Sequence, residues 1–241
     1  MSLGRTWSTS LVGLDGSAVE VEAHLAPGLP AFRIVGLPDA SLGEARERVR
    51  AAVSSCGIAW PMQRVTVGLT PADLPKSGSG FDLAIAMAVL SAARVIDAGV
   101  VSSITHLGEL GLDGRVHRVR GVLPAVAAAV AAGRRQVVVP AANADEAQLV
   151  PGADVIAAHH LAELASRYGA DITDEVDVVP VPQPRPPSKS PVGLDLADVV
   201  GQEHARLALE IAAAGGHHML LHGPPGVCPY VSMRRRSTKT R

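Results

Sequence analysis

Alternating hydrophobic and polar positions dominate the first part of the chain. Arg5–Val12 and Ala18–Leu25 both alternate, and Asp15-Gly16 between them can form a turn, so this region predicts a β-hairpin. Two further alternating stretches predict strands, Phe32–Val35 and Arg64–Leu69.

A helical period replaces the alternation after Phe32–Val35. Pro38, Asp39 and Ser41 are typical of a helix start, and Gly57 after Cys56 is typical of a helix end. The polar face of this helix carries Glu44, Arg46, Glu47, Arg48 and Arg50, and its apolar side carries Val49, Ala52 and Val53. A glycine-rich loop, 71–80, then leads into a second helix, from about Phe81 to Ala93.

The second half alternates strand and helix patterns. His106–Leu110 and Arg115–His117 flank Asp113-Gly114, which predicts a second hairpin, and an alanine-rich helix follows from Val122 to about Ala132. The remaining expected elements are strands at Gln136–Val139 and Asp154–Ala157 and helices at Ala144–Leu149 and Leu161–Tyr168. Early hairpins with late strand–helix alternation indicate an α+β (mixed α/β) fold rather than a doubly wound sheet.

Six prolines between residues 180 and 191 predict an extended spacer, and hence a domain boundary. We expect one domain at 1–178, a linker at 179–192 and the start of a second domain at 193–227. In that second segment a helix is predicted from Gln202 to about Ala214, followed by a short apolar strand that ends at Gly223. The stretch 228–241 has no apolar period and no acidic residue.

The strand ending at Gly223 runs into a turn that resembles the beginning of a phosphate-binding loop. The candidate nucleotide-binding residues are Gly223, Pro224, Pro225, Gly226 and Val227. The G-x-x-x-x-G-K-[ST] motif would require glycine at 228, lysine at 229 and a hydroxyl residue at 230.

The chain has Cys228, Pro229 and Tyr230 at those positions. Lysine supplies the positive charge on the β/γ-phosphates, and the Ser/Thr hydroxyl contacts Mg²⁺. Proline provides neither a charge nor a backbone N–H. We therefore expect no normal ATP turnover by this chain, and we interpret 228–241 either as translation in a shifted frame or as a divergent terminus.

Composition narrows the class of protein. The net charge is −1, and without the five positive charges of the tail it becomes −6, so the body carries no general electrostatic attraction for nucleic acid. The two cysteines, Cys56 and Cys228, are too few for a disulfide framework or a cysteine zinc site. The N-terminus lacks the pattern of a signal peptide, and the longest apolar stretch is too short to span a bilayer, so a cytoplasmic protein without membrane partners is expected.

Four motifs in this order resemble one family. Asp198–Gln202 and His222–Val227 look like the start of an AAA+ module, whereas Arg33–Asp39 and Leu74–Leu83 resemble the N-terminal domain of the magnesium-chelatase-like ATPases known as YifB or ComM. The resemblance covers essentially residues 1–227. It implies an N-terminal domain with the ribosomal S5 domain 2-like, Lon-protease-like fold.

The resemblance also implies a hexameric AAA+ motor that uses ATP and Mg²⁺, and ComM-type members act as DNA branch-migration helicases in natural transformation. Its implied partners are further copies of the subunit and DNA. A chelatase subunit fits less well, because the chelatase ATPase lacks such a long leader. This chain is not expected to bind ATP productively, since the lysine and the Ser/Thr of the first nucleotide motif are missing.

The Lon resemblance raises a serine–lysine peptidase as an alternative. By that resemblance the nucleophile's position falls on Gly80 and the lysine's position near Leu123. No lysine exists between residues 77 and 188 to act as the base. Peptidase activity is therefore not expected, no catalytic residue is assigned, and Ser77 and Ser79 are interpreted as turn-forming residues.

Other candidates have structural explanations beside functional ones. Lys76 with Gly78 and Gly80 could hold an anion or simply shape a turn, and Asp82 could cap the helix that follows. Arg115, Arg118 and Arg120 could contact a phosphate backbone, a neighbouring subunit or only solvent, and the histidine pairs 159–160 and 217–218 with His222 are interpreted as structural, with no metal site. Two hypotheses remain: a defective ATPase fragment, and a non-catalytic module that binds protein or DNA.

Overall fold

The computed structural model describes residues 2–36, 39–76, 78–172, 196 and 201–220. The chain divides into two compact units, Met1–Gln183 and Pro184–Arg241, and each is described by itself. The predicted linker at 179–192 and the candidate residues Gly223, Pro224, Pro225, Gly226 and Val227 lie outside the described residues, as does the part of the expected strand after residue 220.

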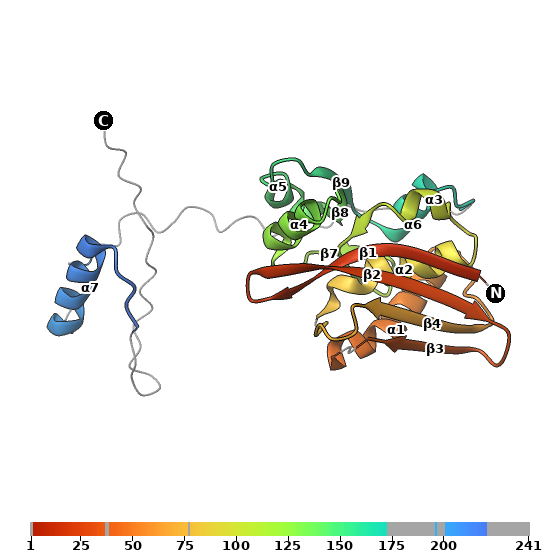
Figure 1. Ribbon diagram of the computed structural model, residues 1–241, viewed down its shortest axis with the longest axis horizontal. Helices are drawn as coiled ribbons and strands as arrows, with labels where there is room; N and C mark the ends of the chain where they lie inside the picture. The colour runs from red at the N-terminus through yellow and green to blue at the C-terminus, as the bar shows by residue number, and fades with distance from the viewer. Residues whose placement is uncertain (1, 37–38, 77, 173–195, 197–200, 221–241) are drawn as a thin grey trace. The chain divides into compact units, whose positions relative to one another are not determined.

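The first two strands form the predicted hairpin. β1 (Ser2–Val12) and β2 (Asp15–Ala26) pair antiparallel along their whole length, as Figure 1 shows in red. The predicted turn position was wrong: Val12 pairs with Asp15, so the turn lies at Gly13 and Leu14, and Gly13 has a φ of 65°. Gly16 belongs to β2, and a Cβ there would come within 2.5 Å of the Ala128 side chain, so the packing at this position is too close for a larger residue.

A mixed seven-stranded sheet runs through the first unit. Its order is β3-β4-β2-β1-β5-β8-β9. The pairs β1–β2 and β2–β4 are antiparallel, whereas β3–β4, β1–β5, β5–β8 and β8–β9 are parallel. The added strands are β3 (Ala31–Val35), β4 (Arg64–Thr70), β5 (Thr105–His106), β8 (Gln136–Pro140) and β9 (Asp154–Ala158). This architecture fits the expected α+β class.

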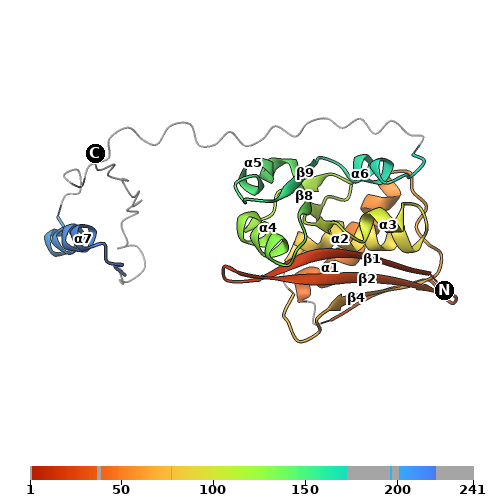
Figure 2. The same cartoon turned by 45° about the horizontal axis from the view of Figure 1, so that its top comes forward.

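Helices α1 (Ala40–Ser55) and α2 (Asp82–Ala92) lie against one face of the strands β1 to β4 (Figure 2). The predicted start and end of α1 are confirmed: the Asp39 carboxylate accepts a hydrogen bond from the Leu42 N–H at 2.7 Å, and Gly57 follows the helix with a φ of 71°. Every residue of α2 is buried, which its continuous apolar sequence predicts. The main core lies between these helices and the sheet.

The remaining elements of the first unit are helices and a small separate hairpin. They are α3 (Ala98–Val101), the two-stranded hairpin β6 (Glu109–Leu110) and β7 (Val116–His117), α4 (Val122–Ala131), the 3₁₀ turn η2 (Ala141–Asn143), α5 (Ala144–Ala147) and α6 (Leu161–Arg167). α4 packs on the β1–β2 ribbon, and with β8 and α5 it encloses a second, smaller core. The second hairpin is confirmed around Asp113-Gly114, but its first strand is only Glu109–Leu110, and His106, which was predicted to start that strand, belongs to β5. The alanine-rich helix is confirmed at nearly the predicted bounds.

The second unit contains α7 (Glu203–Gly215), the helix predicted after Gln202. It ends at Gly216, whose φ of 65° places it in the left-handed region that favours glycine. Leu207 and Ile211 on this helix are exposed. Over the part of the chain that the structure describes, every helix is too short or too polar to cross a lipid bilayer.

Candidate functional site

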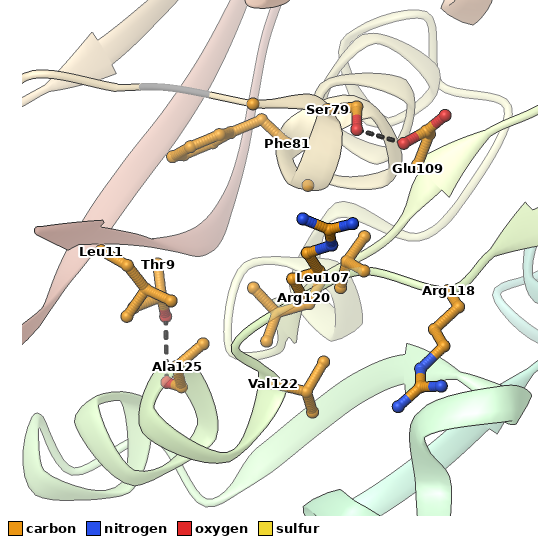
Figure 3. A pocket seen from close by; sticks show the side chains of 13 residues that line it. Thr9, Leu11, Ser79, Phe81, Leu107, Glu109, Arg118, Arg120, Val122 and Ala125 are labelled. Carbon is orange, nitrogen blue, oxygen red and sulfur yellow. Dashed lines mark hydrogen bonds between the residues drawn. The ribbon is translucent and has the colours of Figure 1, made fainter. Parts of the chain in front are cut away.

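A cavity of about 420 Å³ lies where four segments of the first unit meet, one of which carries Leu107 and Glu109. Its walls come from the 3₁₀ turn η1 (Ser79–Phe81) with Gly78 before it, from the end of β1, and from the segment that leads into α4 (Figure 3). The lining residues are Thr9, Leu11, Gly78, Ser79, Gly80, Phe81, Leu107, Glu109, Arg118, Val119, Arg120, Val122 and Ala125.

The glycine turn is held in place by backbone contacts from two sides. Gly78, with a φ of 85°, donates its N–H to the Asp39 carboxylate at 3.2 Å. The Gly80 carbonyl accepts a hydrogen bond from the Gly108 N–H at 3.0 Å. Asp39 therefore caps α1 and fixes the turn at once, a double role that the helix-start pattern did not reveal.

Ser79 does more than shape the turn. Its hydroxyl donates a hydrogen bond to the carboxylate of Glu109 on β6, and the dashed line in Figure 3 marks this contact. Sequence analysis assigned no role to Glu109, because the two residues are 30 positions apart and no local pattern joins them. The pair places one negative charge on the wall of the cavity.

Asp82, directly after the turn, does not cap α2, so that prediction was wrong. Its carboxylate accepts hydrogen bonds from Arg48 Nε at 2.7 Å and Nη2 at 3.0 Å, and from the Leu110 N–H at 3.2 Å. Burial raises the pKa of Asp82 to about 6, although Arg48 and the Leu110 N–H act to lower it. The carboxylate joins α1, α2 and β6 because tertiary packing brings a stronger partner than its own helix end.

Of the two interpretations of Lys76 and its glycines, an anion cradle or a shaped turn, the structure supports the turn. Its side chain is fully buried, and its ammonium group donates a hydrogen bond to the Pro71 carbonyl. Burial lowers its pKa, while Asp73 acts in the opposite direction. The Gly78 N–H is already bonded to Asp39, so neither group is available to an anion.

The arginines after the second hairpin are separated by their surroundings. Asn143 fixes the backbone of this segment: it accepts a hydrogen bond from the Val119 N–H at 3.0 Å and donates one to the Val119 carbonyl at 3.1 Å. Arg118 and Arg120 both line the cavity, and Figure 3 shows Arg120 directed toward its middle.

The three arginines of the predicted strip therefore have different surroundings. Arg115 lies 3.3 Å from the Asp113 carboxylate, and Arg118 lies 3.8 Å from the Glu146 carboxylate. Arg120 is the arginine directed into the cavity (Figure 3).

Of the two positions at which a Lon-like peptidase would carry its catalytic groups, Gly80 lines the cavity. Leu123 does not line it, although its neighbour Val122 at the start of α4 does. Gly80 has no side chain and position 123 is leucine, so neither position supplies the hydroxyl or the amine that the chemistry needs.

The described histidines have structural roles or are exposed. His160 caps α6 through the Ala162 N–H at 3.2 Å, at the helix start where it was predicted, and its Nε2 lies 2.9 Å from the Asp113 carbonyl oxygen. His217 and His218 are exposed, and His222 lies outside the described residues. Within the described ranges no group of three or more His, Cys, Asp or Glu side chains is arranged to hold a metal ion.

Comparison with known proteins places the chain among the chelatase-like ATPases. The family described as subunit ChlI of Mg-chelatase matches residues 21–143, and the magnesium chelatase subunit ChlI family matches residues 195–236, a range that extends beyond Val227. Over 94% of its length the chain is 52% identical to an uncharacterized protein of Mycobacterium tuberculosis, 38% to competence protein ComM of Haemophilus influenzae and 36% to the uncharacterized protein YifB of Escherichia coli.

The chain spans 44% of the length of each of these three relatives. A more distant likeness, 28% identity over 197 residues, links it to the Lon protease of Roseiflexus castenholzii and covers 76% of this chain and 23% of that protein. The family matches fall on both sides of the predicted linker, in the order that the four motifs indicated. The chain therefore belongs to the magnesium chelatase subunit ChlI family, with ComM and YifB among its relatives.

Proposed function

We propose that this chain is the N-terminal portion of a magnesium-chelatase-like ATPase of the ComM type and that it does not itself hydrolyse ATP. The observation that carries the proposal is the combination of the family matches on both sides of the linker with Cys228, Pro229 and Tyr230 in the phosphate loop. Gly223–Val227 supply only the first half of that loop. Without the lysine and the Ser/Thr, the phosphate charges and the Mg²⁺ ion have no partner in the motif.

We further propose that residues 1–178 form a non-catalytic domain of the S5/Lon-like fold. The likeness to a Lon protease supports this fold, as does the cavity that both Gly80 and the start of α4 line. The absence of lysine between residues 77 and 188 supports the loss of peptidase chemistry. In the intact family this domain would assist subunit assembly or engagement of DNA, and the motor would use ATP and Mg²⁺.

Retention of radiolabelled ATP on a filter tests the proposal directly. We expect no micromolar binding by the purified chain, with or without Mg²⁺, and no release of phosphate. A matched variant with Cys228→Gly, Pro229→Lys and Tyr230→Thr restores the motif and reports whether the motif alone limits binding. Micromolar retention of ATP by the unaltered chain would refute the proposal.

The second candidate function is an independent module that binds protein or DNA without turnover. Two structural features of the first unit favour this candidate. The unit has its own hydrophobic core, and its cavity is lined by Arg120. Salt-sensitive DNA binding that survives deletion of 228–241 would favour this candidate, because the five positive charges of the tail would then not be responsible.

A further inference from the structure

Arg120 is the cation of the cavity that is not already engaged. Among the residues that the structure describes, it makes no hydrogen bond, ion pair or ring contact, and it points into the cavity beside Leu107 (Figure 3). Arg118, which also lines the cavity, lies 3.8 Å from the Glu146 carboxylate. The two hydrogen bonds between Asn143 and Val119 fix the backbone between the two arginines, and Arg120 itself is an exposed residue at the cavity.

The floor around Arg120 is apolar. Phe81, Leu107, Val122 and Ala125 line the cavity and are at most 5% exposed. The hydroxyl of Thr9, which also lines it, already donates a hydrogen bond to the Ala125 carbonyl at 3.3 Å. A ligand for this cavity therefore needs an apolar body, with its polar group at one end.

Glu109 limits the charge that the ligand can carry. Glu109 lines the same cavity as Arg120, and its carboxylate accepts a hydrogen bond from the Ser79 hydroxyl, so the cavity wall also carries a negative charge. A polyphosphate or a nucleic acid backbone would bring several negative charges toward that carboxylate. A single carboxylate, by contrast, matches the planar fork of one guanidinium group.

We propose that this cavity binds a monoanionic carboxylate on an apolar body, with Arg120 receiving the carboxylate and the floor of Phe81, Leu107 and Val122 receiving the apolar part. Such a group exists both as the C-terminal residue of a polypeptide and as a free branched-chain acid. The inference goes beyond the proposed function, since it involves neither the phosphate loop nor ATP.

Fluorescence anisotropy of the full chain with a labelled peptide tests the proposal. The probe is a fluorescein-labelled pentapeptide that ends in Ala-Leu with a free carboxylate, and its control is the same peptide with a C-terminal amide. We expect the amide, and the Arg120→Gln variant with the free carboxylate, to bind at least about 10-fold more weakly, because a hydrogen bond to a charged group is lost. Arg50→Gln is the matched control, because Arg50 is an exposed arginine that does not line the cavity, and this variant should bind like the unaltered chain.

A second variant tests the cavity itself. A Cβ added at Gly80 would meet no atom within 4 Å, and Gly80 lines the cavity, so Gly80→Leu should reduce binding without lowering the melting temperature. Competition with 4-methylpentanoate distinguishes the sources: displacement of the probe supports a free acid, and failure to displace it supports a peptide end.

Three outcomes would overturn the proposal. One is equal binding of the acid and amide peptides, and another is absence of probe binding to the unaltered chain. The third is displacement of the probe by a single-stranded oligonucleotide, together with an equal loss of probe binding in Arg120→Gln and Arg118→Gln. That result would assign both arginines to phosphate contacts.

Discussion

Removal of Arg48 should destabilise the first unit strongly and in a pH-dependent way. The Asp82 side chain is fully buried, and Arg48, which is 19% exposed, supplies two of its three hydrogen bonds. Arg48→Met keeps much of the side-chain length and removes the charge. Because an uncompensated buried carboxylate remains, we expect a loss of about 3–5 kcal/mol in the free energy of unfolding at pH 8.

The loss should shrink at low pH. The pKa of Asp82 is about 6 even with Arg48 present, above the ordinary value near 3.8, because burial dominates. The raised pKa means that the contribution of Asp82 to stability is fully present below about pH 4 and is lost as the pH rises through about 6. Without Arg48 the pKa rises further, so at pH 5 the carboxyl group is neutral and costs little to bury.

Urea unfolding followed by circular dichroism at pH 5 and pH 8 measures both effects. Arg46→Met is the matched control, since Arg46 lies on the exposed side of the same helix. The double variant Arg48→Met with Asp82→Leu should recover most of the stability, as replacement of a buried ion pair by apolar groups often does. A loss in Arg48→Met no greater than in Arg46→Met, or a loss of equal size at both pH values, would refute this reasoning.

Two further predictions concern the core of the same unit. His106 is fully buried with Nδ1 2.8 Å from Thr6 Oγ1 and Nε2 3.2 Å from the Tyr168 hydroxyl, and burial lowers its pKa to about 3. The neutral imidazole therefore contributes to stability at pH values above about 6.5, the pKa in the unfolded chain, and this contribution is lost as the pH falls toward about 3. His106→Asn should remove this acid-dependent part from unfolding free energies measured between pH 7 and 4, and an unchanged slope would contradict the prediction. Gly4→Ala should lower stability by about 1–3 kcal/mol, because a Cβ there would come within 2.3 Å of the Ala88 carbonyl oxygen on α2; a melting temperature like that of Gly43→Ala, where a Cβ meets nothing within 4 Å, would contradict it.

The sequence by itself determined most of the helices and strands, and it determined which residues of the expected motifs are absent. Period-2 and helical patterns depend on neighbours a few residues apart, so the hairpins, α1, α2 and α4 could be predicted to within a few residues. The four motifs were sufficient to indicate the family. The absence of lysine from 77 to 188 is likewise a property of the chain alone, whatever its fold.

Only the tertiary structure decided which polar groups meet. Arg48 and Asp82 are 34 positions apart and Thr6 and His106 are 100 positions apart, and no local pattern reports on such pairs. The Lys76 ammonium group donates a hydrogen bond to the Pro71 carbonyl, and Gly16 lies in β2 rather than in the turn. In both cases tertiary packing, not the local sequence, determines the conformation. The cavity around Arg120 exists because the sheet order brings η1 beside the start of α4, and long-range contacts of this kind depend on the whole core rather than on any one segment.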